Sequence, residues 1–152
     1  MQNYSRIIST GSYLPEKILT NKDLEKMVDT SHEWIIERTG IESRHIASED
    51  ESSVDMAYNA SINAIKNAGI DSNTIDMIIV ATTTPERKFP STAVLLQNKL
   101  KNNRAFAFDL NAACTGFIYA LDIANTYIKN GVANRVLVVG TEKITSLLDW
   151  SD

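Results

Sequence analysis

The chain has 152 residues, of which 43% are hydrophobic and 22% charged, a composition typical of a folded globular protein with room for a full core. Its formal net charge of −4 excludes the strongly basic surface that nucleic-acid-binding proteins carry. The apolar runs are too short for a membrane-spanning helix or a secretory signal. The single cysteine can form no intrachain disulfide, so a cytoplasmic location is expected.

Both strands and helices are predicted over residues 5–68. The predicted elements are, in order, a strand over 5–12, a helix over 21–28, a short helix ending at 38, an extended stretch over 41–46 and a helix over 53–68. Thr30 or Ser31 can cap the short helix, and Gly40 can end it. The helix over 53–68 is the most clearly amphipathic, and its predicted inward side chains are Met56, Ala60, Ile62, Ala64 and Ile65.

Three apolar runs in the rest of the chain are predicted to be buried strands. They span 76–84, 105–110 and 135–140, and helices are predicted over 91–100 and 117–128 between them. The runs are largely unbroken by polar residues, which is typical of strands covered on both faces. Because strand and helix alternate along the whole chain, the sequence predicts an α/β layered domain with a mostly parallel sheet.

The only cysteine, Cys114, lies between the predicted strand over 105–110 and the predicted helix over 117–128. The small residues Ala112, Ala113 and Gly116 allow a sharp backbone bend and leave room for a substrate. Free N–H groups and the dipole at a helix N-terminus favour a thiolate, and the same amides can stabilise an oxyanion. The placement therefore predicts a nucleophile, and the alternative is a buried structural cysteine.

Neither histidine is expected to be a catalytic base. His32 lies beside Glu33 in the predicted short helix, and His45 follows Arg44 in the extended stretch. Both are interpreted as groups that hydrogen-bond locally. A cysteine hydrolase needs a histidine next to its thiol, so that class is not favoured. Two histidines and one cysteine so far apart in the sequence also predict no structural zinc site.

Seven short motifs carry a resemblance to a known family. They are 11–15 (GSYLP), 21–24 (NKDL), 28–40 (VDTSHEWIIERTG), 44–46 (RHI), 81–83 (ATT), 89–91 (FPS) and 112–117 (AACTGF). In their order and spacing, essentially the whole chain resembles the N-terminal half of β-ketoacyl-acyl-carrier-protein synthase III, a condensing enzyme of the thiolase superfamily. The resemblance implies a five-layered αβαβα fold of two similar halves. This chain would supply the first half, a half-domain over 1–152 with a mixed, mostly parallel five-stranded sheet and helices on both faces.

The resemblance also implies a reaction, the first condensation of type II fatty-acid synthesis. An acyl group, usually acetyl, passes from coenzyme A to the cysteine. Malonyl-acyl carrier protein then loses carbon dioxide and attacks the thioester, which gives acetoacetyl-acyl carrier protein. By this resemblance Cys114 is the acyl-accepting nucleophile and its own amide is one oxyanion donor. Acetyl-coenzyme A and malonyl-acyl carrier protein are implied as substrates, with no bound cofactor or metal.

Five further residues take roles by the same resemblance. Trp34 matches a tryptophan that stacks on the adenine of coenzyme A, Arg38 an arginine that contacts the nucleotide, and Thr30 a threonine near that ligand. Phe89 matches a phenylalanine that closes the acyl pocket of a dimer partner, and Thr83 lies near that pocket in the family. The residue types alone leave simpler alternatives. Trp34 could be a core tryptophan and Arg38 a solvated surface charge, whereas Thr30 could be a helix cap and Phe89 could take part in ordinary loop packing.

The family's catalytic histidine and asparagine lie in its second half, as do the basic residues that dock the acidic carrier protein. This sequence ends at 149–152 without a further predicted element, so we expect it to be a piece of a longer protein. The complete protein is expected to be a homodimer, and this chain alone is not expected to catalyse condensation. The alternatives are a related condensing enzyme with a longer or branched acyl primer, and a non-catalytic thiolase-like interaction module in which Cys114 is structural.

Overall fold

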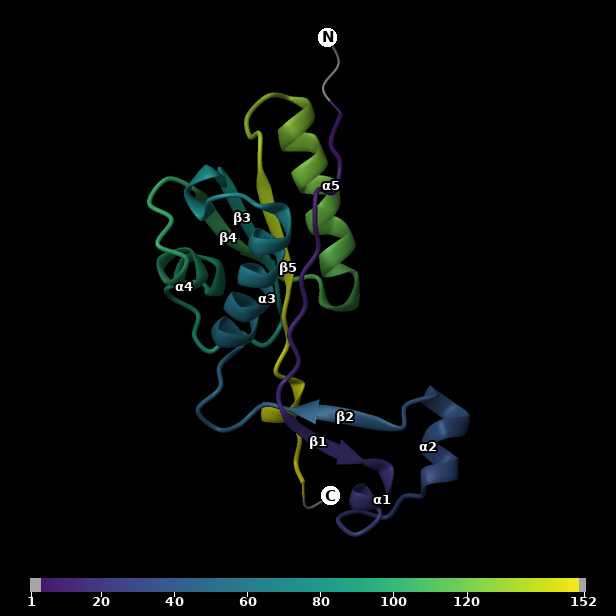
Figure 1. Ribbon diagram of the computed structural model, residues 1–152. Helices are drawn as coiled ribbons and strands as arrows, with labels where there is room; N and C mark the ends of the chain where they lie inside the picture. The colour runs from purple at the N-terminus through teal and green to yellow at the C-terminus, as the bar shows by residue number, and fades with distance from the viewer. Residues whose placement is uncertain (1–3, 151–152) are drawn as a thin grey trace. The chain divides into compact units, whose positions relative to one another are not determined.

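The computed structural model describes residues 4–150, so residues 151 and 152 of the terminal stretch lie outside the described residues (Figure 1). The described chain divides into two compact units. Unit 1 comprises residues 4–13 and 52–142, and unit 2 comprises residues 14–51 and 143–150. Within the described residues, no helix combines the length and the apolar character needed to cross a membrane.

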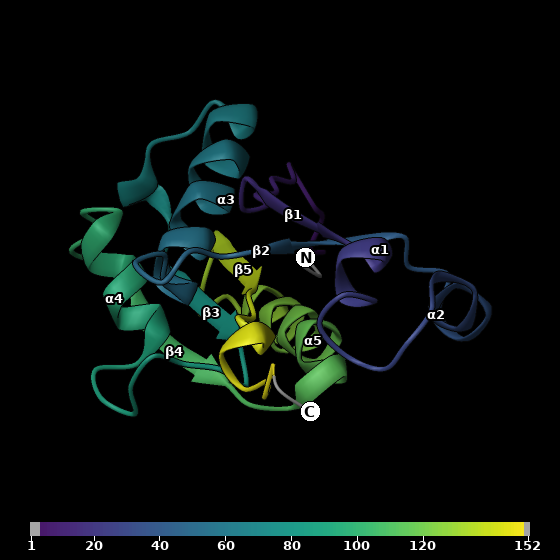
Figure 2. The ribbon, with the colours of Figure 1, turned by 90° about the horizontal axis from the view of Figure 1, so that it is seen from below.

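Unit 1 contains a parallel three-stranded sheet. Its strands are β3 (Met77–Ala81), β4 (Phe106–Leu110) and β5 (Val136–Gly140), in the order β4-β3-β5. Helices α3 (Ser53–Ala68) and α4 (Thr92–Lys99) pack on one face, and α5 (Gly116–Lys129) packs on the other (Figures 1 and 2). The predicted α/β class and the parallel sheet are confirmed.

Strand β3 is the centre of the core. Ile78 and Val80 point towards α3 and α4, whereas Met77 and Ile79 point towards α5, because successive side chains of a strand alternate between its faces. All five residues of β3 are buried, as the unbroken apolar run predicted. The prediction of full burial is wrong for β4 and β5, whose residues are mostly half-buried. Among the described strands, each of these two has a partner on one side only.

Helix α3 has the predicted bounds, but its buried face differs in part from the predicted one. A capping box between Ser52 and Asp55 starts the helix, and Gly69 ends it with a φ of 63°. The fully buried residues are Ser53, Val54, Ala57 and Ser61, and of the five predicted inward residues Ile65 packs, partly buried, against the core. Ile62 is 38% exposed. The helix packs through small side chains because they allow close approach, and the Ser61 hydroxyl donates to the Ala57 carbonyl (2.6 Å).

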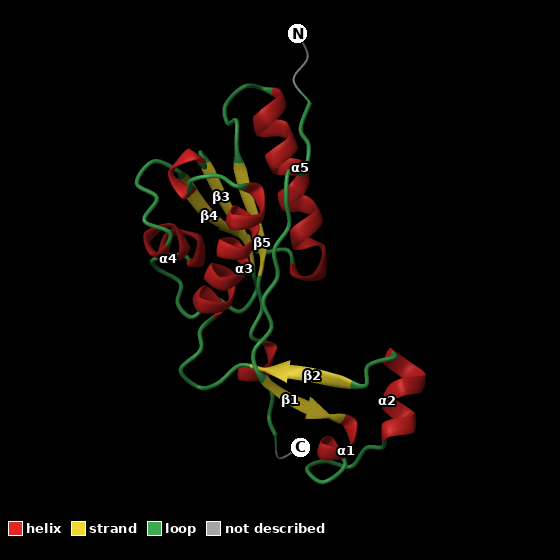
Figure 3. Ribbon diagram, in the orientation of Figure 1, coloured by secondary structure: helices red, strands yellow, loops and turns green. Residues whose placement is uncertain are grey.

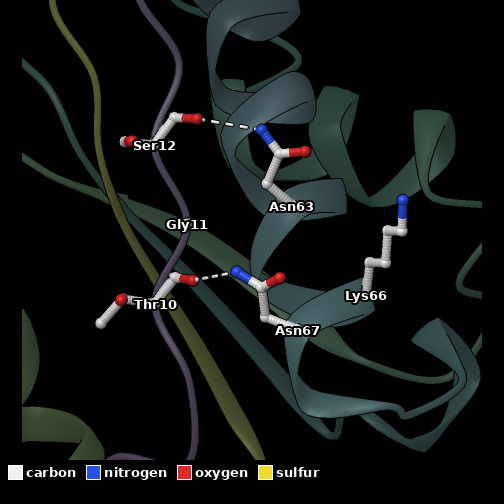
Figure 4. Close-up of a pocket in the computed structure, with 6 residues that line it drawn as sticks. All are labelled: Thr10, Gly11, Ser12, Asn63, Lys66 and Asn67. Carbon is white, nitrogen blue, oxygen red and sulfur yellow. Dashed lines mark hydrogen bonds between the residues drawn. The ribbon is translucent and has the colours of Figure 1, made fainter.

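Residues 5–12, predicted to be a strand, form none. They run extended beside α3, and asparagine side chains of that helix reach their carbonyl groups (Figure 4). The hydrogen bonds run from Ser9 Oγ to the Ala64 carbonyl (2.8 Å), from Asn67 Nδ2 to the Thr10 carbonyl (3.0 Å) and from Asn63 Nδ2 to the Ser12 carbonyl (3.0 Å). At Gly11 a Cβ atom would lie 2.3 Å from the Ala64 nitrogen, so only glycine permits this approach. A helix, not a strand, takes up this segment's hydrogen bonds.

The amino ends of the strands are joined by one carboxylate. Asp76, just before β3, accepts hydrogen bonds from the backbone N–H groups of Asn134 (2.9 Å) and Arg135 (3.1 Å) and pairs with Arg104 (3.0 Å). Partial burial disfavours the charged form, but these donors outweigh it and lower the pKa of Asp76. Charge and hydrogen bonding thereby fix the starts of neighbouring strands.

Unit 2 contains an antiparallel pair of strands, β1 (Lys17–Thr20) and β2 (Ser43–Ile46), with Ile18 opposite His45 (Figure 3). Strand β2 confirms the predicted extended stretch, whereas β1 was missed. The five strands of the described residues therefore divide between two sheets and do not form the single five-stranded sheet that the resemblance implied. The reason is that β1 and β2, among the described strands, hydrogen-bond only to each other.

Two helices complete unit 2. Helix α1 (Asn21–Leu24) is shorter than predicted, and a capping box between Thr20 and Asp23 starts it. Helix α2 (His32–Thr39) begins after Ser31, whose hydroxyl accepts from the Trp34 N–H (3.1 Å), and ends at Gly40 with a φ of 69°. Ser31 rather than Thr30 is thus the cap of α2.

The described residues also contain single turns of 3-10 helix. These are η1 (Ser72–Thr74) and η2 (Ala113–Thr115) in unit 1 and η3 (Ile144–Ser146) in unit 2.

Candidate functional site

Cys114 lies on a tight turn between β4 and α5, as predicted. The turn is the single helical turn η2, and Ala113 within it has a φ of 46°, a left-handed conformation that L-residues rarely adopt. The Thr115 hydroxyl and N–H both donate to the Ala112 carbonyl, at 2.8 Å and 3.2 Å, and close the turn. The thiol of Cys114 is free and exposed. The alternative of a buried structural cysteine is therefore wrong for this chain.

Helix α5 begins directly after the cysteine without a side-chain cap. Helices α1 to α4 each have a capping hydroxyl, whereas Thr115 at the start of α5 makes no such hydrogen bond. The first N–H groups of a helix have no partner within the helix and carry partial positive charge. At the start of α5 the Gly116 N–H donates to the Ala113 carbonyl within the Cys114 turn. The positive end of the helix dipole lies beside Cys114, where it can favour a thiolate or an oxyanion.

Gly116 fixes the distance between this turn and the sheet. It is buried, and a Cβ atom there would lie 3.2 Å from the Ala81 Cβ at the end of β3. The lack of a side chain lets the start of α5 sit against the carboxyl end of the central strand. Side chains that follow parallel strands gather at this edge of a sheet, which is where α/β proteins bind their ligands.

A carboxylate at the same edge joins β3 to β5. Glu142 follows β5 and accepts hydrogen bonds from the N–H groups of Thr83 (2.8 Å) and Thr84 (3.0 Å). It also accepts from the hydroxyls of Thr82 (3.3 Å), Thr83 (3.1 Å) and Thr84. Sequence reasoning missed Glu142. The available signal was a single acidic residue two positions after an apolar strand.

The two residues assigned to an acyl pocket differ in their surroundings. The Thr83 hydroxyl faces Glu142, in the loop after β3. Phe89 lies further along the same loop and is 88% exposed, so it does not pack within this chain. Ordinary loop packing is therefore no explanation for Phe89.

The residues assigned to coenzyme A lie in unit 2, on α2 and just before it. Trp34 is 53% exposed, so it is not the core tryptophan of the simpler alternative. The Arg38 guanidinium carbon lies 4.9 Å from the centre of the Trp34 ring, a cation–π pair formed by residues four apart on one helix face. Thr30 precedes the cap residue and is half-buried. The structure thus presents an aromatic ring and a cation together at the surface.

Both histidines make local hydrogen bonds, as predicted. His32 Nδ1 lies 3.3 Å from Asn21 Nδ2, and the backbone N–H of His32 donates to Glu25 Oε1 (2.6 Å). His45 Nδ1 lies 2.5 Å from the Pro15 carbonyl oxygen. Over residues 4–150, no three side chains of histidine, cysteine, aspartate or glutamate are grouped to hold a metal ion.

Known proteins match this chain in sequence. A family model described as 3-oxoacyl-[acyl-carrier-protein (ACP)] synthase III matches residues 108–152, which include the Cys114 turn. A β-ketoacyl-[acyl-carrier-protein] synthase III of Xanthomonas oryzae is 56% identical over 149 residues, 98% of this chain and 46% of the relative. One of Methylococcus capsulatus is 55% identical over 152 residues, 100% of this chain and 47% of the relative.

Solved structures match the fold. The crystal structure of 3-oxoacyl-[acyl-carrier-protein] synthase III from Aquifex aeolicus superposes with a TM-score of 0.93 at 54% identity, over 97% of this chain and 47% of that one. The priming β-ketosynthase from the R1128 polyketide biosynthetic pathway superposes with a TM-score of 0.95 at 40% identity, over 99% and 45%.

The chain spans about half the length of these relatives, and the matched half is the N-terminal one. The motifs around Cys114, the parallel sheet and the superpositions all agree. The chain is therefore a homologue of the N-terminal half of β-ketoacyl-[acyl-carrier-protein] synthase III and has the α/β thiolase-like fold of that family.

Proposed function

We propose that the complete protein is an acyltransferase that initiates type II fatty-acid synthesis, with Cys114 as the residue that carries the acyl group. It condenses acetyl-coenzyme A with malonyl-acyl carrier protein to give acetoacetyl-acyl carrier protein. One observation carries the proposal: an exposed thiol stands on a left-handed turn at the uncapped start of α5. The relatives named β-ketoacyl-[acyl-carrier-protein] synthase III support it.

The first step is transfer of the acetyl group. The Cys114 thiolate attacks the carbonyl carbon of acetyl-coenzyme A, and a carbon–sulfur bond forms while negative charge gathers on the carbonyl oxygen. Donors at the start of α5, the Cys114 amide among them, stabilise that charge. The bond to coenzyme A then breaks, coenzyme A leaves as its thiolate and takes up a proton, and acetyl-Cys114 remains.

The second step needs groups that the resemblance places in the second half. The malonyl group loses carbon dioxide as its carbon–carbon bond breaks, and the resulting carbanion attacks the acetyl carbon. The bond to Cys114 then breaks and the thiolate is restored. A histidine and an asparagine supply hydrogen bonds to the thioester carbonyl in the family, so we infer that this chain alone does not condense.

Trp34 and Arg38 are the proposed contacts of coenzyme A, with Thr30 nearby. An exposed indole offers a stacking surface for adenine, and a guanidinium suits phosphate. The 4.9 Å pair places both groups on one face of α2, which supports this assignment. Acyl carrier protein is the second proposed partner, through basic residues of the other half.

We further propose that the complete protein is a cytoplasmic homodimer. Strand β4 lies at the edge of its sheet and pairs only with β3 among the described strands, so its other edge is open to a twin strand. Phe89, which is 88% exposed, is the side chain proposed to close the partner's acyl pocket. Thr83 is proposed to lie near the acyl pocket of its own chain. The single free cysteine suits a reducing compartment.

The test is the intact mass of the purified chain before and after incubation with acetyl-coenzyme A. We expect one acetyl group on the chain and none on the Cys114→Ala variant. Isobutyryl-coenzyme A offered in competition reports the choice of primer. Iodoacetamide labelling of the same sample shows whether the thiol is accessible.

A thiol that reacts with iodoacetamide but takes no acetyl group would contradict the proposed nucleophile in this chain. Binding of coenzyme A without acylation would instead favour a non-catalytic interaction module. Preferred transfer of isobutyryl would favour a related condensing enzyme with a branched primer. Trp34→Ala should weaken coenzyme A binding, and Glu37→Ala, exposed on the same helix, should leave it unchanged.

A further inference from the structure

Unit 2 has almost no hydrophobic core. Of its described residues, 14–51 and 143–150, only Pro15, Asn21 and Ile35 are buried. Asn21 is the polar member of this set, and it is 1% exposed. A unit that buries so little apolar surface depends on specific hydrogen bonds to keep its elements in place. The hydrogen bonds of Asn21 therefore show which element it holds.

Asn21 is joined to both ends of helix α2. Its Nδ2 lies 3.3 Å from Nδ1 of His32, the first residue of that helix. The same Nδ2 donates to the Ile41 carbonyl (2.7 Å), and the Asn21 backbone N–H donates to the Glu42 carbonyl (3.2 Å). Both carbonyls follow directly after Gly40, the C-cap of α2. One buried residue thus fixes the start and the end of α2 with respect to α1.

Helix α2 carries the proposed contacts of coenzyme A. Trp34 and Arg38 form their cation–π pair on one face of the helix, and both are exposed. Among the eight residues of α2, Ile35 alone is buried. The direction in which the ring and the guanidinium point therefore depends on how the ends of α2 are held.

The hydrogen bonds of the Asn21 side chain require an uncharged His32. Within residues 4–150, the buried Oδ1 atom of Asn21 has no hydrogen-bond partner, whereas its Nδ2 has two. For Asn21 Nδ2 to donate to His32, the Nδ1 atom must be an acceptor, which is the case only in neutral imidazole. A protonated ring carries an N–H at Nδ1, and this donor would face the donors of the amide.

Protonation of His32 would offer the Asn21 amide a different set of partners. If the amide turned over, Oδ1 would accept from the new N–H at Nδ1, but the Ile41 carbonyl would then lose its donor. Each charge state of His32 therefore leaves one group near Asn21 without a partner. The two arrangements are close alternatives, and the charge of one imidazole selects between them.

His32 is the group of this cluster whose charge changes near neutral pH. Its backbone N–H donates to the Glu25 carboxylate at the C-cap of α1 (2.6 Å). Carboxylates and amines ordinarily titrate outside the range of about pH 5–8 in which histidine does. The charged residues on the segments that meet here are Lys22, Asp23 and Glu25 in α1 and its cap, Glu33, Glu37 and Arg38 in α2, and Glu42 beyond it.

We propose that Asn21 is a positioning residue for coenzyme A, which acts by holding α2, and that protonation of His32 loosens this hold. The inference rests on the proposed contacts Trp34 and Arg38, and it adds to them a residue that acts through the helix and a response to pH. A fall from about pH 8 to about pH 5.5 should weaken binding of coenzyme A more than titration of the ligand's own phosphates does.

The test measures coenzyme A binding by titration calorimetry and amide hydrogen exchange in α2, both on the 152-residue chain. Asn21→Ala should weaken binding at about pH 8 by about tenfold or more and speed exchange in α2 by a similar factor, because both ends of the helix lose a partner. The matched control is Asn63→Ala in α3, which also removes an amide that donates to a backbone carbonyl (3.0 Å). It should change neither measurement.

His32→Asn provides a readout that a purely structural role of Asn21 would not change. The asparagine oxygen replaces the Nδ1 acceptor and does not titrate. The variant should match the wild type at about pH 8 and bind coenzyme A about threefold or more tightly than the wild type at about pH 5.5. Exchange in α2 should be slower in the variant at the lower pH. His45 and the phosphates of coenzyme A are common to both proteins, so the difference reports His32.

Three outcomes would overturn the proposal. They are unchanged binding and exchange in Asn21→Ala, equal effects of Asn21→Ala and Asn63→Ala, and coincident pH profiles of the wild type and His32→Asn. If Asn21→Ala speeds exchange in every element, it has unfolded, and the pH profiles of the other two proteins decide. A wild-type chain that binds no coenzyme A would contradict the proposed contacts, and exchange in α2 would then decide whether Asn21 and His32 hold the helix.

Discussion

At the scale of single residues, the turn that contains Cys114 has a strained backbone conformation at Ala113. A left-handed conformation such as that of Ala113 costs about 1–2 kcal/mol for an L-residue. The turn persists because Thr115 donates twice to the Ala112 carbonyl and because Gly116 lies against the end of β3. The turn leaves the Cys114 thiol exposed, just before the start of α5.

Glu142 stabilises the conformation of the loop over 82–84, which lies about 60 residues earlier in the sequence. Its two carboxylate oxygens accept hydrogen bonds from two N–H groups and three hydroxyls of residues Thr82, Thr83 and Thr84. Two of these three threonines are buried. Without the carboxylate, these donors would lose the acceptor that they share, in a place that water reaches poorly.

We predict that Glu142→Gln lowers the free energy of unfolding by about 1–3 kcal/mol, because an amide accepts fewer hydrogen bonds and carries no charge. Urea unfolding at neutral pH measures the change. The matched control is Glu86→Gln, at an exposed carboxylate that accepts a hydrogen bond from the Val54 N–H (3.3 Å), and it should change stability by less than about 0.5 kcal/mol. Equal effects of the two substitutions would refute a special role for Glu142.

At the scale of elements, helix ends explain much of the local structure. The N-cap residues of helices α1 to α4 are Thr20, Ser31, Ser52 and Ser91, and each accepts a hydrogen bond from the first turn of its helix. Asp55 completes the capping box of α3 and also pairs with Lys99 at the end of α4. One carboxylate thus stabilises the start of one helix and its contact with another.

The pH dependence of stability should report this contact. Partial burial disfavours ionisation of Asp55, but hydrogen bonds from Lys99 and Ser52 outweigh it and hold its pKa at about 2, below the ordinary value of 3.8. The folded pKa is depressed, so the stabilisation is fully present above about pH 4 and is lost as the pH falls towards 2.

We therefore expect that Asp55→Asn is less stable than the wild type at pH 6 and that the difference shrinks between about pH 4 and pH 2. Urea unfolding at a series of pH values measures both proteins. Asp50→Asn, at an exposed carboxylate, is the control and should track the wild type at every pH. A constant difference between Asp55→Asn and the wild type would show that the ionised form is not what stabilises the fold.

On the scale of the whole molecule, the core of unit 1 has two sides that share one strand. One cluster joins β3 to α3 and α4, and the other joins β3 to α5. Met77, Ile78, Ile79 and Val80 are fully buried, whereas large apolar side chains on the outer face of α5 are not. Stability is therefore concentrated in the central strand.

We predict that Ile79→Ala lowers the free energy of unfolding by about 2–5 kcal/mol, because it leaves a cavity between β3 and α5. Ile118→Ala, the same change at a residue of α5 that is 63% exposed, should cost less than about 1 kcal/mol. Thermal or urea unfolding of the three proteins compares them. Similar losses for both variants would mean that the start of α5 is covered in solution.

The sequence by itself determined most of the elements and the candidate nucleophile, because both depend on neighbouring residues. The apolar run over 76–84 specified the central strand, and the helical spacing over 53–68 specified the bounds of α3. The position of Cys114 between a strand and a helix was equally local. The resemblance extended this reading to Trp34 and Arg38, whose exposure and pairing on one helix face the structure supplied.

Tertiary structure alone decided what depends on distant partners. The hydrogen bonds of Glu142 join residues that are 58–60 positions apart, and no local pattern encodes them. The run over 5–12 has a strand-like sequence, yet α3 takes up its hydrogen bonds. Strands β4 and β5 are as apolar as β3 but lie at the edges of the sheet. The reason is that a sequence pattern records how apolar a segment is, while burial and pairing depend on which other segments lie beside it.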